Sequence, residues 1–511
     1  MSLVGNAVAP FRVPLLVRRI LEYGTVLSVT LVVGALAWKT VPTPYSLAFL
    51  VLVMLLALFA TKPLLALHLT VFFTLVADGT TTKWYPMIKN LSSKESILYT
   101  HDALTITPLE VVLFGGFALW AVWHVATRRH TFVRGQFFWP IIVFSFFVFT
   151  GLLWGIGRGG DIRAAIWEIR PFFYLPIVYI LVVNCCRTRV QFRRLLWTAV
   201  GALFIHAIFG ISYWLALPEI EKVGAEGLGE HSSSIHMNVV ILLAIMSVLL
   251  KGCTRTSRFA LCLIALPVSY EWLLNQRRAA VVALALGVIM FVATLYWRQR
   301  ATFRRFVPIA TVLAIGYIGA MWNSTSSAAF PAQAVKAVIA PTDVSSADQS
   351  SDLYRVIENF DLNFTVRATP LMGVGFGQQF YRPINLPDIS FFEFYLYIPH
   401  NSILWVWLKT GFGGFLALFY LLANVLMTGA RAIRAAPQGT DLMISAVTVM
   451  YVAMFSLFAF VDIAWDARST LFLAMCIAFC SQYLRVPTGR RIEQVSNSVP
   501  DQRALSIVGG V

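Results

Sequence analysis

The sequence predicts an all-α polytopic membrane protein with about 12 to 14 transmembrane helices. Of its 511 residues, 58% are hydrophobic and only 13% are charged, which leaves too little polar surface for a soluble protein of this length. The apolar residues fall into long runs, and a helix needs roughly 20 such residues to cross the hydrocarbon core. A much longer polar stretch, 323–400, precedes the last three runs, so a large loop interrupts the bundle there.

Fourteen apolar runs are candidate spans, eleven before this loop and three after it. They lie at 22–41, 45–61, 63–77, 105–127, 136–156, 171–185, 195–217, 236–251, 257–274, 279–297, 306–322, 401–427, 441–462 and 468–484. We therefore expect a transmembrane bundle over 1–322, the large loop over 323–400, the rest of the bundle over 401–484, and a disordered cytoplasmic tail over 485–511.

The basic residues predict the orientation. The chain has 40 Lys and Arg against 24 Asp and Glu, a formal charge of +16. Dense runs such as Arg193-Arg194 and Arg304-Arg305 fall in one alternating set of loops together with both termini, and positively charged short loops stay in the cytoplasm. The large loop then faces outward. Because topology explains the charge, we expect no nucleic-acid partner.

A second group of arginines lies on the expected outer side, where loops meet spans. Arg158, Arg163 and Arg170 share the predicted loop 158–170, and Gln276-Arg277-Arg278 form a turn between two spans. A charge near the bilayer is costly, and the guanidinium fork matches phosphate oxygens. These arginines are therefore candidates for binding a lipid-linked diphosphate. The alternative is that they pair with lipid phosphates or with nearby acids.

A metal site is not expected. A metal that binds a diphosphate needs clustered carboxylates, and the sequence has no Asp-x-Asp pair. Asp462 and Asp466 lie four residues apart at the outer end of a span, where we favour pairing with Arg468 over metal ligation. The glycines of 373–377 lack the context of a nucleotide-binding loop. They predict a tight turn, which would allow the large loop to close over a donor.

Inside the large loop, the residues change in character. Residues 324–350 are rich in Ser, Ala and Pro with little periodicity, and they predict a mobile or extended strap. Apolar residues at helical spacing predict a short amphipathic helix over 351–362. The aromatic side chains that follow are candidates for stacking on sugars or for a membrane-interface belt. They are Tyr381, Phe391, Phe392 and Tyr395.

Three motifs lie around the large loop: the run from Arg367 to Gly377, Pro399-His400-Asn401 with the three residues that follow, and the glycine-rich run from Lys409 to Phe415. Together they resemble the bacterial O-antigen ligase and polysaccharide polymerase family. Upstream, Asn275 to Ala280 is similar to the family's Ser-Arg-Gly/Ala element, and His231 to Asn238 is similar to its Pro-Asn element. The similarity covers roughly 230–430. The chain departs from the family at Lys409, where members often have an acid. It also has two arginines, Arg277 and Arg278, where the family element has one.

The resemblance implies a glycosyltransferase-C-like enzyme in the bacterial inner membrane. Such an enzyme transfers a glycan from a polyprenyl diphosphate to a hydroxyl of a glycan or lipid acceptor on the outer face, with no metal or other cofactor. His400 is the candidate base, because an imidazole titrates near neutrality. The candidate diphosphate ligands are Arg277, Arg278, Arg170, Arg163 and Arg158. Further loop contacts are expected from Arg355, Arg367 and Asn401.

Two other functions remain open at this point. A secondary transporter or flippase of lipid-linked glycans would also have many spans, although the few charges inside the spans and the large outer loop argue against it. A structural partner of an envelope assembly complex would tolerate replacement of His400. The motifs do not separate a ligase from a polymerase, and they identify neither the sugar nor the acceptor.

Overall fold

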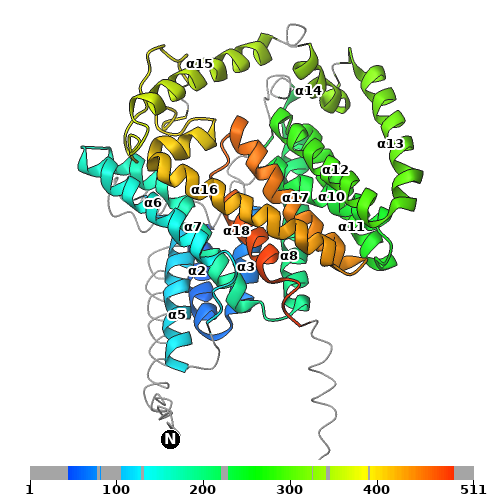
Figure 1. Ribbon diagram of the computed structural model, residues 1–511, viewed down its shortest axis with the longest axis horizontal. Coiled ribbons are helices and arrows are strands. Elements are labelled where there is room, and N and C mark those ends of the chain that lie inside the picture. Colours follow the sequence, from blue (N-terminus) through cyan, green and yellow to red (C-terminus); the bar gives the residue numbers. More distant parts are fainter. Residues whose placement is uncertain are drawn as a thin grey trace, which may run out of the picture.

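The computed structural model describes residues 44–77, 81, 105–127, 132–219, 222, 228–324, 326–340, 346–389 and 392–487. All regular structure within these residues is helical (Figure 1). In chain order the elements are α2 (Pro44–Thr61), α3 (Pro63–Val76), α4 (Pro108–Glu110), the π-helix η1 (Val111–Gly115), α5 (Gly116–Thr127), α6 (Phe138–Gly157), α7 (Ile162–Cys185), α8 (Arg189–Ala216), α10 (Ser233–Leu249), α11 (Arg255–Leu274), α12 (Arg278–Arg298), α13 (Arg300–Met321), the 3-10 helix η2 (Ser327–Ala329), α14 (Phe330–Ile339), α15 (Ser346–Ala368), α16 (Ser402–Ala435), α17 (Thr440–Val461) and α18 (Ala467–Gln482).

The predicted all-α membrane class is confirmed. Thirteen of the fourteen predicted spans coincide with helices, and the first, 22–41, lies outside the described residues. Within the described part of the chain, nine helical segments are long and apolar enough to cross a membrane, and four apolar helices are shorter.

One predicted boundary is wrong. Residues 158–170 were expected to form a loop, but α7 begins at Ile162. The side chain of Asp161 accepts a hydrogen bond from the N–H of Ala164 at 3.0 Å, so it caps the helix. Arg163 and Arg170 therefore lie on the first turns of α7.

The core of the bundle lies where α7, α17 and α18 pack together. α7 packs on α18, and α17 on α16, α12 and α18. α7 and α17 each bury 78% of their most apolar segment, whereas α13, at the edge of Figure 1, buries none of its own. Lipid tails are as apolar as leucine side chains, so the exposed apolar surface of α13 is what a helix facing lipid would have.

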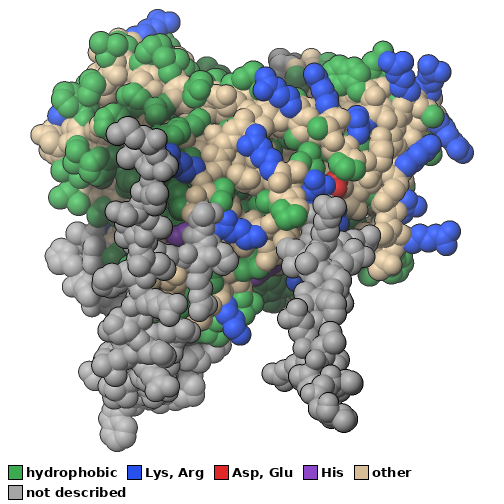
Figure 2. All heavy atoms as spheres, turned by 60° about the horizontal axis from the view of Figure 1, so that its bottom comes forward, with side chains coloured by type: hydrophobic (Ala, Val, Ile, Leu, Met, Phe, Trp, Pro, Cys, Tyr) green, Lys and Arg blue, Asp and Glu red, His purple; other side chains and the backbone are tan. Residues whose placement is uncertain are grey.

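Basic side chains gather at one end of the bundle. Figure 2 shows Lys and Arg on the face that comes forward when the bottom of Figure 1 is turned toward the viewer, with little acidic surface among them. Contacts tie together segments that begin or end helices there: Arg189 and Arg193 bind Asp441, and Arg298 donates to the carbonyls of Arg434 and Ala436. Arg189, Arg193, Arg298 and Arg434 all belong to loops that the charge pattern assigned to one side.

The opposite end carries the large loop, which is more helical than the sequence predicts. The mobile or extended strap predicted over 324–350 is wrong over residues 327–339, because η2 and α14 form there; residues 325 and 341–345 lie outside the described part of the chain. Pro331 lies in the first turn of α14, where its missing N–H is tolerated, and alanines favour the helix after it. The helix predicted over 351–362 is confirmed within the longer α15, which lies with α14 at the top of Figure 1.

Candidate active site

His400 lies where the large loop returns to the bundle, directly before α16. The side chain of Asn401 caps this helix by accepting a hydrogen bond from the N–H of Leu404 at 3.0 Å. Glu358 of α15 binds His400 twice. Imidazole Nδ1 lies 3.2 Å from Oε1, and the backbone N–H donates to Oε2 at 3.0 Å. Both the backbone and the ring of His400 are therefore fixed.

Glu358 determines which nitrogen of His400 can act as a base. The Glu358 side chain is 1% exposed, whereas that of His400 is 18% exposed. Because a carboxylate accepts the proton of Nδ1–H, the lone pair of the neutral ring lies on Nε2. A base oriented by a buried acid is the arrangement that activates a hydroxyl nucleophile in acyl-transfer enzymes.

A second histidine–carboxylate pair faces the first. His231, in the turn before α10, has its Nδ1 2.9 Å from Oδ1 of Asp462, the residue that follows α17. The ring centroids of His231 and His400 are 6.5 Å apart. Burial acts to raise the pKa of Asp462, but the hydrogen bond and electrostatic attraction from His231, together with the nearby Arg355, outweigh it and lower the pKa to about 2. Asp462 is therefore ionised at neutral pH.

Arg278 reaches the same helix that positions His400. Its two terminal nitrogens donate to the carboxylate oxygens of Asp352 at 3.1 and 2.8 Å, and Arg355 lies 3.7 Å from Asp352. Asp352, Arg355 and Glu358 are three residues apart, so they lie on one face of α15. One face of α15 therefore contacts the guanidinium groups of Arg278 and Arg355 and also carries Glu358, the partner of His400.

A comparison with known families finds a match that includes part of this cluster. Residues 259–419 match the family model described as O-antigen ligase. Over these residues the chain is similar to the O-antigen ligase family. The resemblance inferred from the motifs is thereby confirmed over these residues, and no curated protein matches the chain.

The matched segment supplies only part of the cluster. It contains the predicted residues Arg278, Arg355 and His400, together with Glu358. His231 and Asp462 lie outside the matched segment, before and after it. The site is therefore completed by elements that flank this segment in the sequence.

Arg170 has a different environment. Its Nε lies 3.2 Å from Oε1 of Glu110, and a terminal nitrogen donates to Thr105 at 3.0 Å. The guanidinium carbon is 3.8 Å from the centroid of the Trp167 ring. These contacts lie inside the bundle and match the structural alternative, pairing with an acid.

The other predicted arginines lie nearer the surface. Arg163 pairs with Glu393 at 2.9 Å, and both side chains are about half exposed (45% and 60%). Arg158 lies 5.4 Å from the centroid of a tryptophan ring. Arg277 is the half-buried residue before α12, and Arg367 is exposed in the last turn of α15. Their roles toward a diphosphate stay predictions.

The glycine run 373–377 forms the predicted tight turn, but it does so inside the bundle. Gly373, Gly375 and Gly377 have φ angles of 67°, 87° and 77°, a region that favours glycine. The N–H of Val374 donates to the carbonyl of Leu408 on α16 at 2.7 Å. A Cβ at Gly375 would overlap the backbone of α6. These contacts fix the run between α6 and α16. They therefore argue against a hinge at these glycines that would let the large loop close over a donor.

A buried ion pair fixes the same segment to α7. Lys409 Nζ lies 2.7 Å from Glu168 Oε1, and both side chains are fully buried. The other oxygen of Glu168 accepts from the N–H of Gly377 at 2.6 Å, and Lys409 also donates to the carbonyl of Gln378. Lys409, where the chain departs from the family, is thus half of a structural pair. In the sequence, this pair is indicated only by the isolation of Glu168 and Lys409 within apolar segments.

The predicted pairing of Arg468 with Asp462 or Asp466 is wrong. Arg468 lies 2.6 Å from Glu230, Asp466 caps α18, and Asp462 binds His231. The sequence placed Asp462 and Asp466 at the end of a span. It could not show that the turn before α10 lies beside them in the fold, because that contact depends on tertiary packing. His231, Asp462 and Glu358 are the site residues that the sequence reasoning missed.

Proposed function

We propose that this protein transfers a glycan from a polyprenyl diphosphate to a sugar hydroxyl, as an O-antigen ligase or a polysaccharide polymerase. The observation that carries the proposal is the meeting of the His400–Glu358 pair and Arg278 on one face of α15. The match to the O-antigen ligase family over 259–419 supports the substrate class. Such a transfer needs a base for the acceptor and positive charge for the departing diphosphate, and this face of α15 supplies both.

In this mechanism Nε2 of His400 takes the proton from the acceptor hydroxyl as its oxygen attacks the anomeric carbon of the donor. The new C–O bond forms while the bond from that carbon to the diphosphate oxygen breaks. The electron pair of the broken bond leaves with the diphosphate. Glu358 stabilises the imidazolium, as a buried carboxylate does in the Ser-His-Asp triad.

Arg278 and Arg355 are the arginines that we assign to the diphosphate. The fork of Arg278 already holds two oxygens of one anion, Asp352, in the geometry that also suits a phosphate. Asp352 is 45% exposed, so an incoming diphosphate is able to replace it. Positive charge at this position stabilises the charge that grows on the leaving group.

The location follows from the two ends of the bundle. The basic face would lie in the cytoplasm with both termini, and the α15 end would lie on the outer side of a bacterial inner membrane. Donor lipids would reach the site from the bilayer. Within the described residues, no group of three or more His, Cys, Asp or Glu is arranged to hold a metal ion. Metal independence nevertheless stays a prediction, which transfer assays with and without EDTA will test.

The test is the profile of lipid-linked glycans in host membranes carrying His400→Ala. We expect loss of transfer with normal membrane insertion. Accumulated single repeat units on the lipid would indicate a polymerase, and accumulated full-length chains would indicate a ligase. Asn363→Ala, on an exposed position of α15, is the matched control and should behave like wild type. An unchanged profile in His400→Ala would contradict the proposal and favour the transporter or the structural partner.

His231 is a second candidate for the base, because its Nδ1 is also held by a buried carboxylate. We favour His400, since its acid lies on the helix that also holds Arg278. His231→Asn should then reduce transfer less than His400→Ala does. The reverse order of effects would exchange the two roles.

A further inference from the structure

A polar cavity of about 620 Å³ opens between the start of α7 and the loop that follows the glycine run. Its volume is within the range of ligand-binding pockets. The loop contributes residues 377–382 and Asn385, and Tyr397 comes from the turn before His400. Gly159 and Asp161 come from the turn between α6 and α7. Nothing in the proposed reaction yet uses this cavity.

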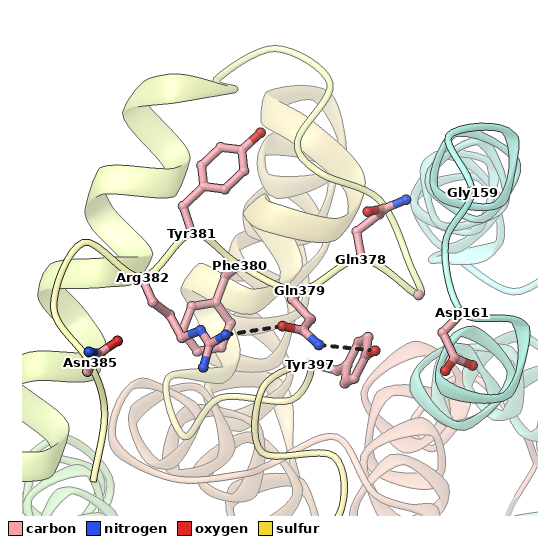
Figure 3. Close-up of a pocket in the computed structure, with 10 residues that line it drawn as sticks. Gly159, Asp161, Gln378, Gln379, Phe380, Tyr381, Arg382, Asn385 and Tyr397 are labelled. Atoms are coloured by element: carbon pink, nitrogen blue, oxygen red, sulfur yellow. Dashed lines mark hydrogen bonds between the residues drawn. The ribbon is translucent and has the colours of Figure 1, made fainter. Parts of the chain in front are cut away.

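The side chains around the cavity suit hydroxyl groups. Figure 3 shows Arg382, Gln379 and Tyr397 in a row: Arg382 donates to the Gln379 carbonyl at 3.3 Å, and the Gln379 amide lies 3.3 Å from the Tyr397 hydroxyl. Asp161, the residue before α7, lies at the other side of the cavity. Amides, a hydroxyl, a guanidinium and a carboxylate together offer both donors and acceptors, as a sugar requires. The ring of Tyr397 adds an apolar face for the C–H groups of a sugar.

The cavity has a rigid base. Lys409 donates to the carbonyl of Gln378, and the carbonyl of Gly377 accepts from the N–H of Asp161 at 2.8 Å. Phe380 is 2% exposed and belongs to a small apolar cluster with Leu362 and Leu408. The buried Glu168–Lys409 pair thus holds this part of the wall in place. A preformed wall reduces the entropy that binding would otherwise lose.

The loop that lines the cavity is hydrogen-bonded to α15, the helix that positions His400. Asp361 of α15 accepts a hydrogen bond from the N–H of Ile384 at 3.2 Å, and Thr365 accepts from the N–H of Tyr381 at 2.9 Å. The same helix holds His400 through Glu358, and Tyr397 is three residues from His400. The cavity and His400 therefore belong to one connected part of the large loop, so a glycan that reacts at His400 is able to extend toward the cavity.

We propose that this cavity is a saccharide-binding subsite that holds the part of a glycan chain beyond its reacting sugar. The inference deepens the proposed function and rests on it for the identity of the ligand as a glycan. Arg382, Gln379, Asp161 and Tyr397 make the polar contacts. The subsite selects the glycan by its hydroxyl pattern and takes no part in breaking the glycosidic bond.

The experiment measures binding without transfer. Protein in lipid nanodiscs is titrated with the repeat-unit oligosaccharide released by mild acid from the lipid-linked glycan of the host, and the Kd is measured by saturation-transfer NMR. The double variant Gln379→Ala with Arg382→Ala should bind at least about tenfold more weakly, because two hydrogen-bonding groups are lost. Tyr397→Phe, which keeps the ring, should weaken binding by a few fold. Asn363→Ala is the matched control and should retain wild-type affinity.

His400→Ala separates this inference from the proposed reaction. It should bind the oligosaccharide with wild-type affinity while it fails to transfer. If His400→Ala transferred normally and the double variant still lost binding, the proposed base would fail and the subsite would stand. Wild-type affinity in the double variant, or no binding by the wild-type protein, would overturn the subsite. Thermal unfolding of each variant confirms that it is folded.

Discussion

Two arginine–carboxylate pairs, Arg278–Asp352 and Arg170–Glu110, contain arginines predicted to bind the same diphosphate, yet they differ in exposure. Arg170 and Glu110 are 8% and 9% exposed, whereas Arg278 and Asp352 are 21% and 45% exposed. Removing one partner of a desolvated pair leaves a buried charge. A half-exposed carboxylate gives way to another anion at little cost. The exposure of the partner, more than the presence of an arginine, therefore distinguishes a binding position from a structural one.

The largest expected effect comes from the acid behind His400. Glu358→Gln keeps the size of the side chain but removes the charge that stabilises the imidazolium. We expect transfer to fall by about 10²- to 10⁴-fold, the range for general acid–base catalysis, with little change in the KM for the donor. Initial rates with isolated lipid-linked donor provide the measurement. A KM effect alone would place Glu358 in binding.

Arg278→Ala tests the exposed pair. Loss of its fork should reduce transfer by about 10²- to 10³-fold, as removal of one stabilising donor does in other enzymes. Arg278→Lys retains the charge without the fork and should recover only part of the activity. Full activity in Arg278→Ala would move the diphosphate site elsewhere, with Arg277 as the next variant to measure.

Arg170→Met tests the buried pair, and the expected effect is on stability. Leaving Glu110 buried without its cation should lower the free energy of unfolding by about 3–5 kcal/mol. Thermal unfolding in detergent measures this loss, and the fraction that stays folded should transfer at the wild-type rate. Normal stability with a specific loss of donor binding would assign Arg170 to the diphosphate after all.

Asp352→Asn should produce the smallest change. If Asp352 occupies the position of the diphosphate in the free protein, its neutral analogue should compete less and lower the KM for the donor by a few fold, since an exposed pair contributes about 0–1 kcal/mol. An increase in KM would indicate that Asp352 instead positions Arg278 for the substrate.

The sequence predicted the bundle well because span-length apolar runs leave few alternatives to helices. It located His400 and Arg278 because both lie in short motifs next to spans. It could not locate Glu358 or the His231–Asp462 pair, since partners 42 and 231 residues apart meet only through tertiary packing. The start of α7 was missed because charged residues within a helix resemble a loop when only hydropathy is considered.

The Glu168–Lys409 pair also has a consequence for biosynthesis. Glu168 belongs to a helix that the ribosome completes early, and its partners Gly377 and Lys409 are synthesised 209 or more residues later. Until then α7 would enter the membrane with an acid that has no cation beside it. Assembly of the bundle must therefore delay close packing around α7, or keep Glu168 protonated or hydrated, until the chain has emerged beyond α16.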